Sequence, residues 1–349
     1  MARNKLQIQK EWEMEPPSVS VFVPVFNSEE TIGACLQSLL NQTRPPHEVI
    51  VVDNGSTDRT IETIKGFSQE HQGLNLVLAS QSIKGPAACR NHGEALSKGE
   101  IICFTDADCV AGPDWIRDVV EAFSVSGVGA VAGNLYGYKP SGVIQEFLSL
   151  YTLRGLAHDR TFQSYTLTEG GFATANLSVR RKVFDEVSGF DQSMRYGEDH
   201  DLCARIMEKG YKLRYIRGGV VYHIHRNSLK GFARQSFFTG MAQADLLRKY
   251  HSGVLLMEMP GRTFRREPYA RRIWVKGITA DKKLIVLTAL WIFISWGWLF
   301  PLLYGLYLVL SVANKARATD IRFVSMKPLI WTGLLIIKSI LVTAGRCTG

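Results

Sequence analysis

Two aspartates one residue apart, Asp106 and Asp108, come after the apolar run EIICF and a single threonine. Carboxylate oxygens are hard ligands of the kind that Mg2+ and Mn2+ prefer, and such an ion neutralises the charge of a diphosphate. The pair therefore predicts a metal site, with one carboxylate on the ion and the other on the ion or on a ligand hydroxyl. The same triplet is only a solvated turn in many proteins, and its position after a buried strand favours the metal interpretation.

A third carboxylate, Asp53, ends the apolar run EVIVVD and precedes the turn Asn54-Gly55-Ser56. A carboxylate at a strand end can accept hydrogen bonds from a ribose or a nucleobase. It can equally hold its own turn by accepting from backbone N–H groups. The residues alone leave both interpretations open.

The elements that must position these aspartates alternate between strand and helix. Such alternation predicts an α/β fold with a largely parallel sheet and helices on both faces, and ligands then bind at the carboxyl ends of the strands. Asn27, Asp53, Asp106 and Asp108 all fall at that edge. The expected strands are 19–25, 48–53, 75–80 and 100–104, and the expected helices are 29–40, 57–70 and 86–97.

The second half of the expected α/β region is less regular. The segment FATANLSVRR predicts a strand that enters a helix at Arg181, and GEDHDLCARIMEKG predicts a loop and a helix that ends at Gly210. A strand, KLRYIRGGVVYHI, follows. Residues 136–167 have weak periodicity and several aromatics, and we interpret them as helices and loops that cover the site.

Five segments together resemble the family 2 glycosyltransferases, which have the GT-A fold. The resemblance covers roughly residues 18 to 235, and five motifs in the family's order are far more specific than any one of them. It implies a nucleotide-diphospho-sugar transferase-like sheet flanked by helices. The segments are VFVPVFN (21–27), VVDNGSTD (51–58), KGPAACRNHG (84–93), FTDAD (104–108) and YGEDHDL (196–202).

The resemblance assigns the donor side of the site. It implies that Pro24, Phe26 and Asp53 line the nucleotide base pocket, with Arg90 near the nucleotide. Asp106 and Asp108 would be the metal-binding pair, and Asp106 would also contact the donor. The implied cofactors are Mn2+ or Mg2+ and a nucleotide-sugar donor, with a UDP-sugar favoured.

The resemblance also assigns the acceptor side. Glu198-Asp199 matches the family's ED motif, so Asp199 would deprotonate the acceptor hydroxyl in an inverting displacement and Glu198 would orient it. The alternative is that these acidic residues only favour the N-terminus of the next helix. The segment VYHIHR resembles a strand end that supplies a histidine metal ligand, which points to His223. A hydrogen-bonded structural histidine is the alternative, and strand period places His225 on the opposite side.

Two positions depart from the family's usual residues. Asn54 stands where many members carry aspartate, and Cys89 stands where alanine is usual. Neither change removes a proposed catalytic group. The segment QSFFTG, which begins at Gln235, lacks the QxxRW signature of processive synthases, so the resemblance favours a single transfer over polymerisation.

The C-terminal part of the sequence predicts membrane attachment. Residues 284–313 contain no charged residue and are long enough to enter a bilayer, and Pro301 could bend them into a hairpin. A second apolar segment, Pro328 to Gly345, contains Lys338 and could span the membrane, snorkel or lie in the interface. Basic residues flank the first segment and favour a catalytic domain on the cytoplasmic side of the cell membrane. They are Arg262, Arg265, Arg266, Arg271, Arg272, Lys276, Lys282, Lys283, Lys315, Arg317 and Arg322.

These features predict four regions. They are an N-terminal lead (1–17), a GT-A domain (18–250), a basic juxtamembrane linker (251–283) and membrane-embedded helices (284–349). The net charge of +9 is explained by the membrane-flanking residues, and no basic-aromatic motif for nucleic acid is present. The six cysteines form no CxxC pair, which excludes a zinc knuckle and favours a reducing compartment.

We therefore predict an inverting, metal-dependent glycosyltransferase of the hexosyltransferase type. Its expected partners are a nucleotide sugar, a lipid-linked or cell-surface glycan acceptor and membrane lipid. The alternatives are a polyprenyl-phosphate sugar synthase, which would share the fold and the membrane association, and a degenerate membrane-bound module that binds sugar without catalysis. A sugar nucleotidyltransferase is disfavoured because no GxGTR loop occurs near the N-terminus.

Overall fold

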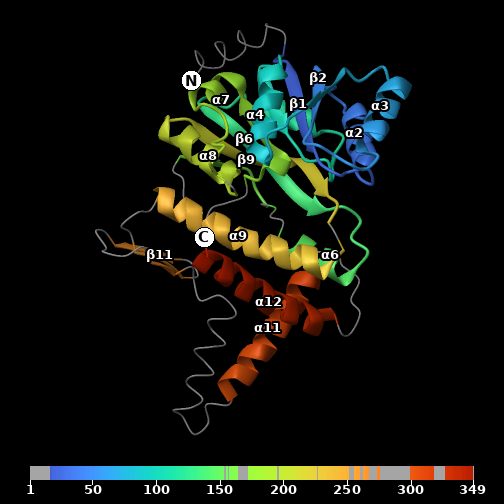
Figure 1. Ribbon diagram of the computed structural model, residues 1–349. Helices are drawn as coiled ribbons and strands as arrows, with labels where there is room; N and C mark the ends of the chain where they lie inside the picture. Colours follow the sequence, from blue (N-terminus) through green and yellow to red (C-terminus); the bar gives the residue numbers. More distant parts are fainter. Residues whose placement is uncertain are drawn as a thin grey trace. The chain divides into compact units, whose positions relative to one another are not determined.

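A computed structural model (Figure 1) describes most of the chain, and it divides into two compact units. Unit 1 comprises residues 1–138, 154–193 and 198–224, and unit 2 comprises residues 139–153, 194–197 and 225–349. The described residues are 16–152, 155, 157–163, 172–194, 196–225, 227–250, 255–259, 262–266, 273–275, 299–317 and 327–348.

Unit 1 is built on one sheet whose described strands follow the order β3-β2-β1-β4-β8-β6-β9-β5, with β7 also paired to β9. The strands are β1 (Val19–Val25), β2 (Glu48–Asp53), β3 (Leu76–Ser80), β4 (Ile101–Phe104), β5 (Cys109–Ala111), β6 (Val128–Gly137), β7 (Arg160–Phe162), β8 (Leu177–Arg180) and β9 (Lys212–His223). The helices are α2 (Ile32–Leu40), α3 (Thr60–Glu70), α4 (Pro86–Leu96), α5 (Trp115–Ala122), α7 (Arg181–Glu186) and α8 (Glu198–Glu208), with a 3-10 turn η1 (Thr174–Asn176).

The prediction of a largely parallel sheet is correct for one half only. Strands β3, β2, β1 and β4 are parallel, whereas β8 is antiparallel to both β4 and β6, and β5 and β7 are antiparallel to β9. The sheet as a whole is therefore mixed. The cause lies in β8, which follows a long excursion of the chain and enters the sheet from the opposite direction.

Both faces of the sheet are covered, as the near-continuous apolar strands require. On one face, Phe22, Ile50 and Phe104 pack into a single cluster with side chains of α4, α7 and α8, such as Phe184 and Leu202. The alternate residues of the same strands are equally buried on the other face, where α2 packs near β5 and α5 packs on β9. The expected helices of the first half are confirmed, although α2 and α3 each begin three residues later than predicted.

Unit 2 contains the helices α6 (Val143–Tyr151), α9 (Leu229–Tyr250), α11 (Leu299–Arg317) and α12 (Lys327–Thr348), and a small sheet of β10 (Leu255–Met259), β11 (Arg262–Arg266) and β12 (Ile273–Val275). An apolar cluster joins the helices through Phe147, Phe232, Val312, Trp331 and Leu334. Within the part of the chain that the structure describes, one helix is long and apolar enough to cross a membrane. It is residues Lys327–Arg346 of α12, with a mean hydropathy of 1.7 and 33% of its residues buried.

Several predictions concern residues outside the described ranges. They include the N-terminal lead up to residue 15, the apolar segment from 284 to 298, and the basic residues at 271, 272, 276, 282 and 283. The four predicted regions of the chain stay a prediction.

Candidate active site

The carboxyl ends of the parallel strands bring the predicted residues to one edge of the sheet. In the register of β1 with its two neighbours, Val25 lies opposite Asp53 of β2, and Phe22 lies opposite Phe104 of β4. Asp53 and Asp106 therefore leave the sheet at the same edge, with only β1 between their strands. This is the edge at which open α/β sheets bind ligands.

Asp53 is 8% exposed, and its carboxylate holds the turn that follows it. It accepts hydrogen bonds from the backbone N–H groups of Gly55 (3.0 Å) and Ser56 (3.1 Å). Gly55 has a φ of +86°, a conformation that favours glycine. The structural interpretation of Asp53 is thus shown, and its contact with a nucleotide stays a prediction.

The hydrogen bonds of Asn54 explain why this position has an amide, whereas many family members carry a carboxylate there. Its side-chain nitrogen donates to the carbonyl oxygens of Gln81 (2.8 Å) and Ile83 (2.9 Å), and its side-chain oxygen accepts from the N–H of Gly85 (3.1 Å). An aspartate has no donor for the two carbonyls. Asn54 therefore fastens the loop after β2 to the loop that leads into α4.

The predicted base pocket has one exposed aromatic wall. Phe26 directly follows β1 and is 55% exposed, and the ammonium of Lys84 lies 5.5 Å from the centre of its ring. Pro24 is partly buried within β1. An exposed ring beside a cation offers a stacking surface for a planar base and a positive charge for a phosphate.

Arg90 connects two motifs that lie far apart in sequence. It is 4% exposed, and its guanidinium donates to Asp106 Oδ1 (3.0 Å) and to Glu198 Oε1 (2.6 Å). Burial alone lowers the pKa of Arg90, but the adjacent carboxylates of Asp106 and Glu198 outweigh burial and raise it above the ordinary value. The Phe190 ring lies 5.7 Å from the guanidinium carbon. The buried guanidinium of Arg90 thus fixes segment 106–108 against the start of α8.

Glu198 and Asp199 begin α8 and differ in their surroundings. Glu198 is 9% exposed, and burial, together with the neighbouring charge of Asp199, raises its pKa against the opposing effect of Arg90. Asp199 is only partly buried, and its Oδ1 accepts from the N–H of His200 at 2.8 Å. The deeper carboxylate is held by the arginine, whereas the shallower one is partly open to solvent, and its role toward an acceptor stays a prediction.

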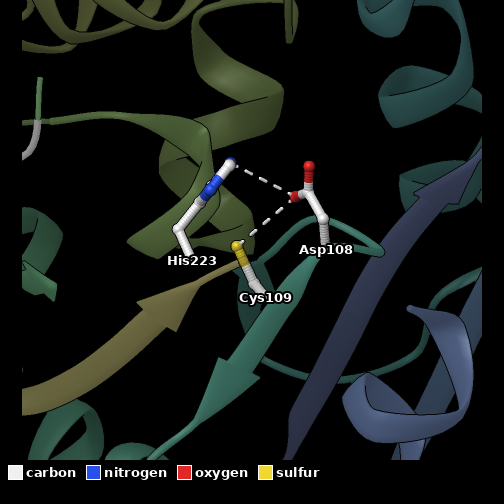
Figure 2. A group of neighbouring side chains, drawn as sticks. All are labelled: Asp108, Cys109 and His223. Atoms are coloured by element: carbon white, nitrogen blue, oxygen red, sulfur yellow. Dashed lines mark hydrogen bonds and ion pairs between the residues drawn. The ribbon is translucent and has the colours of Figure 1, made fainter. Parts of the chain in front are cut away.

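Asp108, Cys109 and His223 form a cluster at the end of segment 106–108 (Figure 2). Cys109 lies opposite His223 in the antiparallel pairing of β5 with β9. His223 Nε2 is 3.4 Å from Asp108 Oδ1, and Cys109 Sγ is 3.8 Å from the same oxygen. The backbone N–H of Ile224 donates to the Asp108 carbonyl at 2.7 Å, which holds the two segments together.

The donor set of this cluster fits a divalent cation. One donor atom from each of the three residues lies within 4.8 Å of the other two, so only a small side-chain adjustment separates them from ligation of one ion at about 2.0–2.3 Å. Carboxylate oxygen suits Mn2+ and Mg2+, whereas imidazole and thiol are progressively softer ligands. Burial, and then the charges of Asp106 and Asp108, raise the pKa of the Cys109 thiol well above its ordinary value, so it is the weakest of the three donors.

The structure brings some predicted metal ligands together and separates another. Asp108 and His223 lie in the cluster, and Cys109 joins them although the sequence did not single it out. Asp106 lies outside that cluster in the described residues, and one of its oxygens faces Arg90. The roles of all these residues at a metal stay predictions. His225 is 5% exposed and lies beyond the end of β9, in unit 2.

The sheet and the arrangement at its edge define a GT-A-like α/β fold, and comparison with known proteins agrees. Residues 20–188 match the family model described as glycosyl transferase family 2. The chain is 32% identical over 210 residues to the glycosyltransferase AglE of Haloferax volcanii. The match covers 59% of this chain and 67% of that protein. The chain belongs to glycosyltransferase family 2.

Two further similarities are more partial. The chain is 30% identical over 235 residues to the pre-mycofactocin glycosyltransferase of Mycobacterium tuberculosis, and the match spans 65% of this chain but only 48% of that protein. The mannosyltransferase PcManGT of Pyrobaculum calidifontis, solved in complex with GDP-Man and Mn2+, has a TM-score of 0.55 at 17% identity and covers 98% of this chain and 94% of that one. The second similarity shows the fold.

Proposed function

We propose that this chain is an inverting, metal-dependent glycosyltransferase that moves a hexose from a nucleoside-diphosphate sugar to an acceptor hydroxyl at a membrane. The observation that carries the proposal is the bridge made by Arg90. By binding Asp106 and Glu198 at once, it places the predicted donor segment and the predicted base Asp199 at one edge of the sheet. A transferase needs donor and base to meet in one place.

Different residues of unit 1 bind the base, the diphosphate and the cation in the proposed reaction. The Phe26 ring stacks on the base, and the ammonium of Lys84 beside it faces the diphosphate. Asp53 stabilises the adjoining turn. Asp108 and His223 would hold Mn2+ or Mg2+, with Asp106 on the donor. When bound, the cation supplies positive charge to the departing diphosphate.

Asp199 removes the proton of the acceptor hydroxyl, and the oxygen attacks the anomeric carbon on the side opposite the diphosphate, which inverts the configuration. Glu198 is the less suitable base, because its side chain is buried and its Oε1 is bound to Arg90 at 2.6 Å. It orients Asp199 by anchoring the first turn of α8. Donor UDP-sugars are favoured among the possible nucleotides, and the acceptor class is a lipid-linked or cell-surface glycan.

Membrane attachment through unit 2 and a cytoplasmic position of unit 1 belong to the proposal. The apolar helix α12 and the uncharged sequence of residues 284–313 support the attachment, and the basic residues that flank that sequence support the cytoplasmic position. The four-region division of the chain at residues 17, 250 and 283 is proposed on the same grounds.

A thermal-shift panel of UDP-, GDP- and dTDP-sugars, each with and without Mn2+, tests the donor half of the proposal. A ligand that binds only the native state raises the melting temperature. We expect one nucleotide class to raise it, and to raise it more with Mn2+ than without. If no nucleotide sugar shifts the melting temperature under either condition, the transferase proposal is wrong.

A further inference from the structure

Helix α12 has two different sides along its full length. The exposed side is apolar or small and repeats at helical spacing through Leu329, Gly333, Ile337, Ile340 and Ala344. The large members of this stripe, with Ile330 beside it, are between 47% and 53% exposed. A stripe of this kind requires an apolar partner, because exposed apolar patches of monomers are rarely so continuous.

The opposite side of α12 is fixed to α6 by polar contacts that cover its first half. Lys327 Nζ pairs with Glu146 Oε1 at 2.7 Å, and Trp331 Nε1 donates to the Val143 carbonyl at 3.0 Å. Near the middle of the helix, Lys338 Nζ donates to the Tyr151 carbonyl at 2.7 Å. The lysine that interrupts the apolar sequence is thus used within unit 2.

The second half of α12 is fixed to α9 by backbone contact. A Cβ added at Gly345 would lie 2.0 Å from the Phe237 carbonyl oxygen, and one at Gly240 would lie 2.1 Å from the Val342 carbonyl oxygen. Arg346 Nε also donates to Gln243 Oε1 at 2.6 Å. Two glycines let the helices meet at backbone distance, so α12 cannot leave α9 without losing this packing.

These neighbours are incompatible with a bilayer interior. Helix α9 carries an exposed Arg234 and an Asp245–Arg248 pair whose side chains are 30% and 49% exposed. A helix that crossed the bilayer beside α9 would carry these charges, and the Lys327–Glu146 pair, toward the hydrocarbon. The length and hydropathy of α12 permit a span, but its packing does not.

We propose that α12 lies in the plane of a lipid bilayer, with its exposed stripe in the acyl region of one leaflet and its polar side on unit 2. The occupant of the stripe is lipid, because residues 261–283 directly precede the uncharged segment and contain eight basic and two acidic residues, a balance that suits anionic head groups. Helix α11 adds exposed apolar side chains of its own at Leu302, Leu303, Leu306, Tyr307 and Leu310. This inference refines the proposed membrane attachment and does not depend on the proposed chemistry.

Spin-label depth measurements on the full chain test the proposal. Single cysteines replace Leu329, Ile337, Ile340 and Ala344 in a Cys347→Ser background, and the other five cysteines of the chain are buried. The nitroxides are compared in vesicles of equal parts phosphatidylcholine and phosphatidylglycerol by their accessibility to oxygen and to a nickel chelate. A label at Lys65, exposed on α3, serves as the solvent reference.

An in-plane helix predicts the same shallow depth at all four sites. A spanning helix predicts a depth that is greatest near Ile337 and differs by roughly 12 Å between positions 329 and 337, at about 1.5 Å per residue. That profile would overturn the proposal. So would full nickel accessibility in the presence of vesicles, or spin–spin broadening without lipid, which would mean that a second copy of the chain covers the stripe.

The double variant Ile337→Asp/Ile340→Asp separates this inference from the proposed chemistry. It should weaken vesicle binding by about tenfold or more, because two apolar side chains are replaced by charges. Ile337→Leu/Ile340→Leu is the matched control and should bind normally. The nucleotide-sugar thermal shift of both variants should equal that of the parent chain, so loss of vesicle binding and loss of donor binding are scored independently.

Discussion

At the scale of single residues, carboxylates of one chemical type have been given three different environments. Asp53 accepts backbone N–H groups, Asp106 faces a buried arginine, and Asp108 faces an imidazole. The Asp53 carboxylate holds its own turn, whereas the Asp108 carboxylate lies beside two further side chains that could ligate a cation. The environments therefore separate turn-forming, donor-side and metal-side roles better than residue type does.

Replacing Asp108 by alanine should weaken Mn2+ binding by more than about tenfold, because the oxygen shared by His223 and Cys109 is removed. Free Mn2+ is measured by electron paramagnetic resonance in the presence of the nucleotide that gives the thermal shift. Asp114→Ala, which removes an exposed carboxylate paired with Arg117, is the matched control for the change in charge and should bind as the parent does. Equal Mn2+ affinity in both variants would place the metal elsewhere.

Replacing Arg90 by methionine should destabilise the protein by about 3 kcal/mol, because two carboxylates lose their shared cation. The value lies at the low end for buried pairs, since the Asp106 side chain is 30% exposed and keeps some water. Urea unfolding measures the change. The control is Arg59→Met, whose pair with Glu29 is 80% exposed on the arginine side and should contribute less than about 1 kcal/mol. Equal losses in the two variants would contradict the bridging role of Arg90.

The sequence predicts where these residues leave the sheet, but it does not predict their partners. Asp53 and Asp108 could be placed at strand ends because Asp53 ends one apolar run and Asp108 follows another by only a few residues. The partner of Arg90 at position 198 is 108 residues away, and no local pattern specifies it. Cys109 was missed for the same reason, because its place beside His223 follows from the pairing of β5 with β9.

At the scale of elements, α4 positions Arg90, and one glycine sets how closely α4 approaches the sheet. A Cβ at Gly93 would lie 2.0 Å from a carbon of the Phe22 ring, a distance that real Cβ atoms do not reach. The helix can pack on β1 only because this position has no side chain. The segment KGPAACRNHG therefore contains both Arg90 and the glycine that allows α4 to pack closely on β1 and so position Arg90.

Gly93→Ala should destabilise the protein by about 1–3 kcal/mol through overpacking against Phe22. Gly66→Ala on α3 is the matched control: a Cβ there meets nothing within 4 Å, so the change should be neutral or stabilise by up to about 1 kcal/mol. Thermal unfolding of both variants gives the comparison. An unaffected Gly93 variant, or equal destabilisation of the two variants, would show that the approach of α4 does not depend on Gly93.

The elements themselves were predictable where hydrophobic periodicity is strong. Strands β1, β2 and β3, helix α4 and the start of α7 at Arg181 were all expected. The direction of β8 was not, because periodicity identifies a strand without saying how it enters the sheet. In the region expected to be helices and loops, the short strand β7 (Arg160–Phe162) also appears, since three residues are too few to give a pattern.

At the scale of the whole molecule, the chain combines a family 2 glycosyltransferase unit with a second unit whose apolar helix is held by polar contacts. The sequence alone left three possibilities for the segment around Lys338: to span, to snorkel or to lie in the interface. Only the contacts of Lys338 and Gly345 with α6 and α9 distinguish them, and such contacts have no signature in the composition of the segment. An enzyme anchored in this way would work on acceptors presented at the membrane surface.

The central claim is that one carboxylate at the start of α8, Asp199, serves the reaction, while its neighbour Glu198 serves the structure. Asp199→Asn keeps the size of the side chain and an acceptor oxygen for the His200 N–H, so it should leave the fold and donor binding nearly unchanged. It removes the group that takes the proton, so turnover should fall by about 100-fold or more.

The decisive measurement is therefore the rate of nucleoside diphosphate release in the presence of acceptor, compared for the parent chain and Asp199→Asn at matched donor occupancy. Loss of turnover with an unchanged donor thermal shift is the predicted result. Full turnover in Asp199→Asn would contradict the proposed mechanism, because the reaction would then not require a base at position 199.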